Sequence, residues 1–168
     1  IAVGFKNLMF SEGFDDFSSA VCHLEDGVAT ITCACAEVGQ GFVTLAQQIT
    51  REILGVEEVI LAPAATETVG SAGSTSASRQ TWMSGGAVQK ACEEVRLKLL
   101  QRVTEEHEIG IDDLVLAEGQ VLSLNGDFSI SIDVATENPL EARVEYRHAP
   151  TFPLDENGQG DAHVSFAF

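Results

Sequence analysis

The spacing of apolar residues along the chain predicts two amphipathic helices. The first is expected over residues 41–54 and the second, the longest element, over residues 75–106. The apolar residues that share one face of the first are Phe42, Leu45, Ala46, Ile49, Ile53 and Leu54. Those of the second are Val88, Ala91, Cys92, Val95, Leu99 and Val103. Each set repeats about every 3.6 residues, the period of a helix that turns one stripe toward a core.

Runs with alternating or continuous apolar residues predict strands around these helices. The expected strands cover residues 1–8, 18–24, 28–36 and 56–62, and charged residues alternate with Val144 and Tyr146 over 141–147. Glu25-Asp26-Gly27 predicts a tight hairpin between the second and third of them, and Asn125-Gly126 predicts a later turn. This order of elements predicts an α+β fold, with mixed sheets packed against two main helices.

Small and glycine residues mark the expected helix ends. Gly55 is expected to end the first helix as its C-cap. Ser74 or Thr75 is expected to begin the second helix as its N-cap. Gly85 and Gly86 lie inside the second helix and are expected to weaken its first turns.

Both helices follow glycine-rich turns, which indicates a site for an anion. Gly39-Gln40-Gly41 precedes the first helix, and the small residues of 70–81 run into the second. Free N–H groups and the helix dipole favour a phosphate at such ends, so the two turns could hold one elongated anionic ligand. Ordinary capped turns are the alternative. Arg79 opposes the dipole unless an anion is near, which favours a ligand. The turns match neither GxxxxGK[ST] nor GxGxxG, the usual nucleotide-binding motifs.

Charge narrows the classes of partner. The chain has 26 acidic and 9 basic residues and a formal net charge of -17. Nucleic acids and anionic membrane surfaces are therefore excluded, because both require basic patches. The chain also lacks a run of about 18 apolar residues, as a membrane-spanning helix requires.

The cysteines favour a structural interpretation. Cys33 and Cys35 alternate in an apolar run, so they are expected on one face of a strand. They are either a pair of metal ligands or two small buried apolar residues, and the second alternative is favoured. With Cys22 and Cys92 they form no CxxC or zinc-finger spacing, which indicates reduced thiols in a cytosolic protein.

Other chemistry is sparse. No GxSxG motif or evident nucleophile–base pair occurs in the sequence. His163 lies beside a glycine-rich turn and is the histidine most expected to have a function. Glu37 is either a functional carboxylate or, more simply, a surface residue at a strand end. Trp82 and Met83 are expected to be core anchors in the first turns of the second helix.

Three segments together resemble a known family. AEVGQGFVTLAQQITREILG (36–55) precedes TETVGSAGSTSASRQTWMSGGAVQKAC (66–92), and LDENGQGDAHVSFAF (154–168) ends the chain. They resemble the large-subunit molybdenum cofactor-binding region of the xanthine dehydrogenase/aldehyde oxidase family, and they occur in the order found there. The resemblance implies a cytoplasmic molybdenum hydroxylase, similar to xanthine dehydrogenase, that hydroxylates a purine or related heterocycle with water-derived oxygen. Two alternatives remain: an oxidoreductase for aldehydes or other heterocycles, and a stand-alone module that binds a phosphorylated ligand.

The resemblance also implies site residues. Those that would hold the cofactor are Gln40, Gly41, Ala77, Ser78, Arg79, Gln80 and Thr81. Ala77 would pack against the metal, and Ser76 and Ala77 would border the substrate. No catalytic residue is expected here, because the general-base glutamate of the family lies beyond this segment.

The cofactor implied is molybdopterin with molybdenum, in its cytosine dinucleotide form. FAD and 2Fe-2S clusters would lie in other domains or subunits, which are the expected partners. Residues 1–168 are therefore expected to be part of a molybdopterin-binding domain in a longer chain, inactive without the rest.

Overall fold

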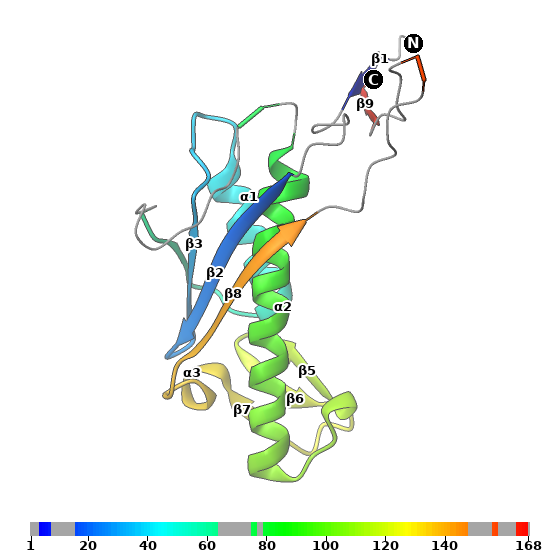
Figure 1. The fold of residues 1–168 in the computed structure, drawn as a ribbon. Coiled ribbons are helices and arrows are strands. Elements are labelled where there is room, and N and C mark those ends of the chain that lie inside the picture. The colour runs from blue at the N-terminus through cyan, green and yellow to red at the C-terminus, as the bar shows by residue number, and fades with distance from the viewer. Residues whose placement is uncertain are drawn as a thin grey trace.

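The computed structural model describes residues 4–7, 16–63, 75–76, 79–147, 156–157 and 164–167. Its strands are β1 (Gly4–Asn7), β2 (Phe17–Glu25), β3 (Val28–Cys33), β4 (Val59–Leu61), β5 (Leu114–Ala117), β6 (Gln120–Ser123), β7 (Ser129–Ser131), β8 (Leu140–Arg147) and β9 (Val164–Ala167). Its helices are α1 (Phe42–Leu54), α2 (Gln80–His107), the short 3-10 helix η1 (Ile111–Asp113) and α3 (Ile132–Ala135). The predicted α+β class, with mixed sheets and two main helices, is confirmed (Figure 1).

The main sheet has four strands in the order β4-β3-β2-β8. β2 pairs antiparallel with both β3 and β8, whereas β3 pairs parallel with β4. The parallel pair is possible because α1 provides the crossover between its strands. The hairpin turn between β2 and β3 places Asp26 and Gly27 at φ 47° and 74°, as the predicted tight turn requires. Strands β1 and β9 form a separate antiparallel pair.

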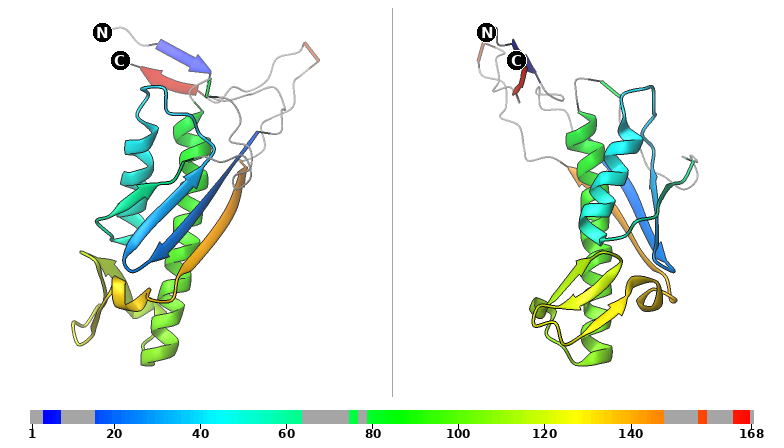
Figure 2. Two further views of the ribbon diagram at one scale, coloured as in Figure 1. Left: turned by 90° about the vertical axis from the view of Figure 1, so that its left-hand side faces the viewer. Right: turned by 180° about the vertical axis from the view of Figure 1, so that it is seen from behind.

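Helices α1 and α2 lie together along one face of the main sheet (Figures 1 and 2). The predicted stripe of α2 is confirmed, because all six of its apolar residues are fully buried. On α1, Phe42, Ala46 and Leu54 are buried, while Leu45, Ile49 and Ile53 are partly buried against the core. This apolar layer between helices and sheet is the core, and it fixes where each helix begins relative to the strands.

Helix α2 continues beyond the main sheet, and the small sheet β5-β6-β7 lies beside its C-terminal half (Figure 1). Gly55 ends α1 in the left-handed conformation, with its N–H donating to the Arg51 carbonyl at 2.9 Å, so the predicted C-cap is confirmed. The Gly55 carbonyl accepts the N–H of Gly119 at 2.7 Å. A Cβ on Gly55 would lie 3.2 Å from the backbone of Ala117. This position therefore joins α1 directly to the small sheet.

The first turns of α2 differ from the prediction in two respects. The helix begins at Gln80, and Arg79 at its N-cap position makes no side-chain capping bond. The prediction of Thr75 as N-cap is wrong, because its hydroxyl instead accepts a hydrogen bond from Gln80; Ser74 lies outside the described residues. Met83 is a core anchor as predicted, but Trp82 is 50% exposed, so that prediction is wrong for Trp82.

Gly85 and Gly86 do not interrupt α2, and packing explains why glycine occupies these positions. A Cβ on Gly86 would lie 2.7 Å from Cε1 of Tyr146 on β8. A Cβ on Gly85 would meet Ile49 and Leu45 of α1 at 3.4 and 3.5 Å, which are ordinary contacts. At Gly86 the helix therefore lies so close to Tyr146 of β8 that a side chain would not fit without a shift.

We expect Gly86→Ala to destabilise the protein. The clash with Tyr146 costs about 1–3 kcal/mol, as in other overpacked sites, while alanine returns about 1 kcal/mol of helix propensity. The matched control is Gly85→Ala, which should be neutral or stabilising by up to about 1 kcal/mol. Urea denaturation of both variants measures the difference, and equal midpoints would contradict this packing.

Candidate functional site

The turn before α1 is shaped by its glycines and by the side chain of Gln40. Gly39 and Gly41 have φ of 94° and 83°, a conformation that side chains disfavour. Gln40 Nε2 donates to the Ala36 carbonyl at 2.7 Å, and Gln40 Oε1 accepts the N–H of Val38 at 2.7 Å. The Gln40 amide thus closes the turn on itself and has a fixed orientation.

Glu37 binds the N-terminal end of α1. Its Oε1 accepts the N–H groups of Gly39 at 2.7 Å and Gly41 at 3.2 Å, and its Oε2 accepts the Val43 N–H at 3.0 Å. The N–H groups of Val43, Gly41 and Gly39 hold the pKa of Glu37 below its usual value. The exposed Glu37 therefore has a structural role, and an external phosphate at this helix end would have to displace a carboxylate of the chain itself.

Gln80 joins the two predicted turns. Its Oε1 accepts a hydrogen bond from Gln40 Nε2 at 2.7 Å, so the residue before α1 and the first residue of α2 meet side chain to side chain. Gln80 Nε2 donates to Thr75 Oγ1 at 3.0 Å and to Cys35 Sγ. The two arms suggested by the sequence are thus adjacent in space.

A cavity of about 260 Å³ lies at this junction. The residues that line it are Gln40, Gly41, Phe42, Leu45, Gln80 and Thr81. Four of these were predicted site residues, and Phe42 and Leu45 add apolar surface that the prediction did not assign to the site. The lining contains amide, hydroxyl and apolar groups and no carboxylate. It suits a ligand that is recognised by hydrogen bonds and flat apolar contact.

Arg79 is buried rather than directed at this cavity. Its Nε donates to Asp16 Oδ2 at 2.9 Å, its Nη2 donates to Asp16 Oδ1 at 2.5 Å, and Nη2 also donates to the Phe17 carbonyl at 3.1 Å. The Arg79 side chain is 0% exposed and that of Asp16 is 4% exposed. The anion that compensates Arg79 at the helix end is therefore Asp16, and the argument from Arg79 to an external ligand fails.

Of the other residues predicted to have a function, the structure describes only some. Ser76 is exposed, and its carbonyl accepts the Arg79 N–H at 3.1 Å. Ala77 and Ser78 lie outside the described residues, as does His163. Their contacts with a cofactor, metal or substrate therefore stay predictions.

Cys33 is buried, and Cys35 lies partly buried just beyond the end of β3. Burial raises the pKa of Cys33 to about 11. Burial also raises the pKa of Cys35, while hydrogen bonds with Ser84 and Gln80 act against that rise. Within the described ranges, no three His, Cys, Asp or Glu side chains are grouped so that they could bind a metal ion.

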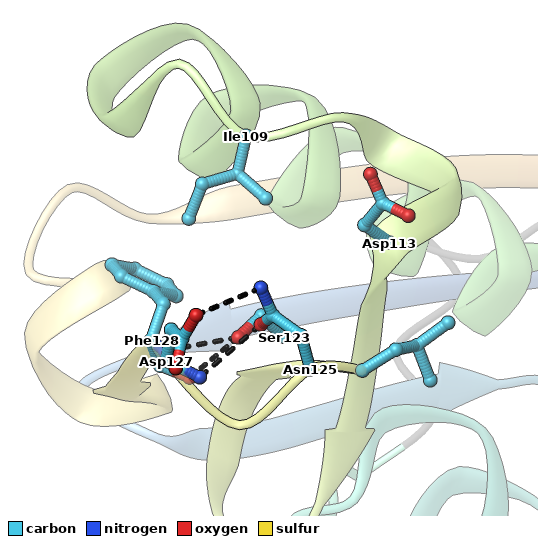
Figure 3. Close-up of a pocket in the computed structure, with 7 residues that line it drawn as sticks. Ile109, Asp113, Ser123, Asn125, Asp127 and Phe128 are labelled. Carbon is cyan, nitrogen blue, oxygen red and sulfur yellow. Dashed lines mark hydrogen bonds between the residues drawn. The ribbon is translucent and has the colours of Figure 1, made fainter.

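A larger cavity of about 610 Å³ lies between the residues that follow α2 and the turn after β6 (Figure 3). It shares no lining residue with the cavity at the Gln40–Gln80 contact. Its polar groups largely bond each other. Asn125 Nδ2 donates to Asp127 at 3.1 Å, and Ser123 Oγ accepts the Phe128 N–H at 2.9 Å. These bonds shape the turn between β6 and β7, so the polar groups of the cavity serve the turn itself.

In the part of the chain that the structure describes, no helix has both the length and the apolar character to cross a membrane.

Comparison with known proteins decides the family. A family model described as molybdopterin cofactor-binding domain matches residues 1–168. The chain belongs to the molybdopterin cofactor-binding domain family. The large subunit of nicotine 6-hydroxylase from Paenarthrobacter nicotinovorans is 36% identical over 95 residues, which cover 55% of this chain and 12% of that subunit.

Solved structures show the same fold for this molybdopterin cofactor-binding domain. Quinoline 2-oxidoreductase from Pseudomonas putida 86 matches with a TM-score of 0.78 and 20% identity, over 88% of this chain and 22% of that chain. CO dehydrogenase from Oligotropha carboxidovorans matches with a TM-score of 0.75 and 18% identity, over 88% of this chain and 21% of that chain. The domain thus spans about one-fifth of the length of these structures, and less of the nicotine 6-hydroxylase subunit.

The described residues fit the cofactor that names the family. Gly39 and Gly41 leave open space within 4 Å of where a Cβ would stand, so a flat group can approach the backbone. The first turn of α2 contains no acidic residue to repel a phosphate. The cavity, at about 260 Å³, is slightly smaller than ordinary ligand sites, whose volumes begin at about 300 Å³. It can therefore enclose only part of such a cofactor.

We expect Asp16→Asn to destabilise the domain by about 3–5 kcal/mol, because it leaves the buried Arg79 charge without a counter-ion. Chemical denaturation measures the loss, and Asp16→Leu combined with Arg79→Met should recover much of it. The control is Glu145→Gln, which breaks the exposed Glu145–Arg147 pair and should cost less than about 1 kcal/mol. A loss for Asp16→Asn as small as that of the control would contradict the buried pair.

Glu37→Gln should lower stability in a pH-dependent manner. The pKa of Glu37 is depressed in the folded protein, so its carboxylate stabilises the fold above the unfolded value of about 4.3. This contribution is lost as the pH falls through the lower, folded pKa. Melting temperatures should therefore differ at neutral pH and converge in acid. A difference that is the same at every pH would show that the charge of Glu37 has no part in binding the helix end.

Proposed function

We propose that this chain is the molybdenum cofactor-binding portion of the large subunit of a molybdenum hydroxylase. The single observation that carries the proposal is the Gln40–Gln80 contact at 2.7 Å. It brings together, beside one cavity, two residues that the family resemblance implies for cofactor binding. When bound, the cofactor supplies the two-electron redox chemistry by which such enzymes hydroxylate a carbon atom.

The residues of this chain would bind and orient the cofactor. Gln40, Gly41, Gln80 and Thr81 line the cavity and would contact the cofactor directly. Arg79 would act indirectly, because its pair with Asp16 fixes the start of α2. Ala77 and Ser78 would complete the arm that leads into α2, with Ala77 beside the metal and Ser76 and Ala77 toward the substrate.

The proposed substrate is a purine or related heterocycle. Two of the similar proteins are named for nitrogen heterocycles, nicotine and quinoline. This favours a heterocycle over an aldehyde or carbon monoxide, the substrates named for other similar structures. The preference for a purine rests on the sequence resemblance alone. A stand-alone module for a phosphorylated ligand is less favoured, because Glu37 already occupies one of the two helix ends that such a ligand would use.

Other parts of the enzyme would complete the site. The cavity is open and encloses only part of a cofactor, which supports the proposal that residues 1–168 belong to a longer chain. The general-base glutamate, the FAD and the 2Fe-2S clusters would come from other domains or subunits, and the cofactor would be the cytosine dinucleotide form. All four cysteines are free thiols, which is compatible with the cytoplasm that we propose as its location.

Gln40→Ala in the full enzyme should lower its molybdenum content. The variant removes the amide that holds the turn and contacts the cofactor, and an unsatisfied buried partner costs about 1–3 kcal/mol. Metal analysis and pterin fluorescence measure occupancy, and circular dichroism checks the fold. The matched control is Gln48→Ala on the exposed side of α1, which should retain full occupancy. Normal molybdenum content in the Gln40→Ala enzyme would contradict the proposed function.

A further inference from the structure

Behind the Gln40–Gln80 contact, a line of polar side chains runs into the core. Gln80 donates to Cys35 Sγ, and Cys35 also hydrogen-bonds the side chain of Ser84. Ser18 Oγ donates to Ser84 Oγ at 3.2 Å. Ser18 and Ser84 are both fully buried, between β2 and α2. The cofactor contacts proposed above do not by themselves explain why polar groups should continue inward from the cavity.

The line has one evident effect, which is to fix which way the Gln80 amide points. The two ends of a side-chain amide differ, since the nitrogen donates and the oxygen accepts. Cys35 Sγ and Thr75 Oγ1 both accept from Gln80 Nε2, so Gln80 Oε1 is left to face Gln40 Nε2. Thr75 is exposed, whereas Cys35 is partly buried. The Cys35 contact is therefore the one better shielded from competing water.

The backbone of its own turn fixes the Gln40 amide, so the Gln80 amide has to present its oxygen for the two to meet. Gln40 Nε2 donates one hydrogen to Ala36 and the other to Gln80. If the Gln80 amide were reversed, two N–H groups would face each other and the contact would be lost. The contact that joins the two arms thus depends on a sulfur atom just beyond the end of β3.

We propose that Cys35 is a positioning residue of the cofactor site, whose sulfur fixes the Gln80 amide and thereby the contact between Gln80 and Gln40. This inference rests on the proposed function. A positioning role and a simple packing role require different side chains at position 35. Packing requires a small apolar side chain, which valine provides, whereas positioning requires a hydrogen-bond acceptor, which serine provides.

The test uses the full enzyme with its partner subunits, in the variants Cys35→Ser, Cys35→Val and Cys92→Ala. Cys92 is the control thiol: it lies in the same helix as Gln80, is buried, and contacts Thr50 rather than the site. Molybdenum content, pterin content and the rate of cofactor release in mild denaturant are measured, together with the unfolding temperature.

Cys35→Val should release the cofactor about fivefold faster than the unmodified enzyme, as expected for loss of one hydrogen bond. Cys35→Ser should remain within about twofold, since its hydroxyl accepts the same bond. Cys92→Ala should lower the unfolding temperature and leave occupancy unchanged. This pattern, in which the polar substitution rescues and the apolar one does not, supports positioning.

The reverse pattern, with occupancy retained by valine and lost by serine, overturns the inference, as does loss of folding in both variants. Gln40→Ala separates this failure from that of the proposed function. If Gln40→Ala loses cofactor while Cys35→Val does not, only the role of Cys35 fails. If Gln40→Ala retains cofactor, the site itself is misplaced.

Discussion

The buried pair of Arg79 and Asp16 is the constraint on which the rest of the site depends. A guanidinium with no exposed surface must find its charge partner inside the protein, because an unpaired buried charge is very costly. Asp16 immediately precedes β2, and Arg79 immediately precedes α2. Two hydrogen bonds join the side chains of Arg79 and Asp16, so this pair fixes the start of α2 against β2 of the main sheet. Gln80 and Thr81 directly follow Arg79 in the chain, so this pair also determines their positions beside the cavity.

At the N-terminal ends of α1 and α2, which meet at the cavity, positive charge is neutralised by different side chains. At α1, the carboxylate of Glu37 binds the free N–H groups. At α2, no acidic residue lies in the first turn, and the one cation there is neutralised by Asp16. The cavity between them is therefore lined by uncharged groups, although the whole chain has a net charge of -17. Under the proposed function, the cavity would therefore recognise its ligand through the direction of amide hydrogen bonds more than through attraction between charges.

The sequence correctly predicted those features that depend on residues close together in the chain. The buried stripe of α2, the extent of α1 and its Gly55 cap follow from residues close together in the chain, and each is confirmed. The later start of α2 could not be predicted in this way, because Arg79 is held by Asp16, 63 residues away. The need for Gly86 is likewise set by Tyr146 on a distant strand. At the site, the glycine-rich turns before the two helices suggested two arms, and the Gln40–Gln80 contact joins them. The roles of Glu37 and Cys35 come only from contacts visible in three dimensions.

The position of β2 between β3 and β8 has a consequence for biosynthesis. The β2–β3 hairpin and α1 are made of neighbouring segments, so they can form while the chain is still being translated. Helix α2 packs against α1 and β2, which precede it in the chain, and against β8, which follows it. Its docking surface is therefore complete only after residue 147 has left the ribosome. Because α1 and β2 precede α2 in the chain, the Gln40–Gln80 contact can form before β8 joins the sheet.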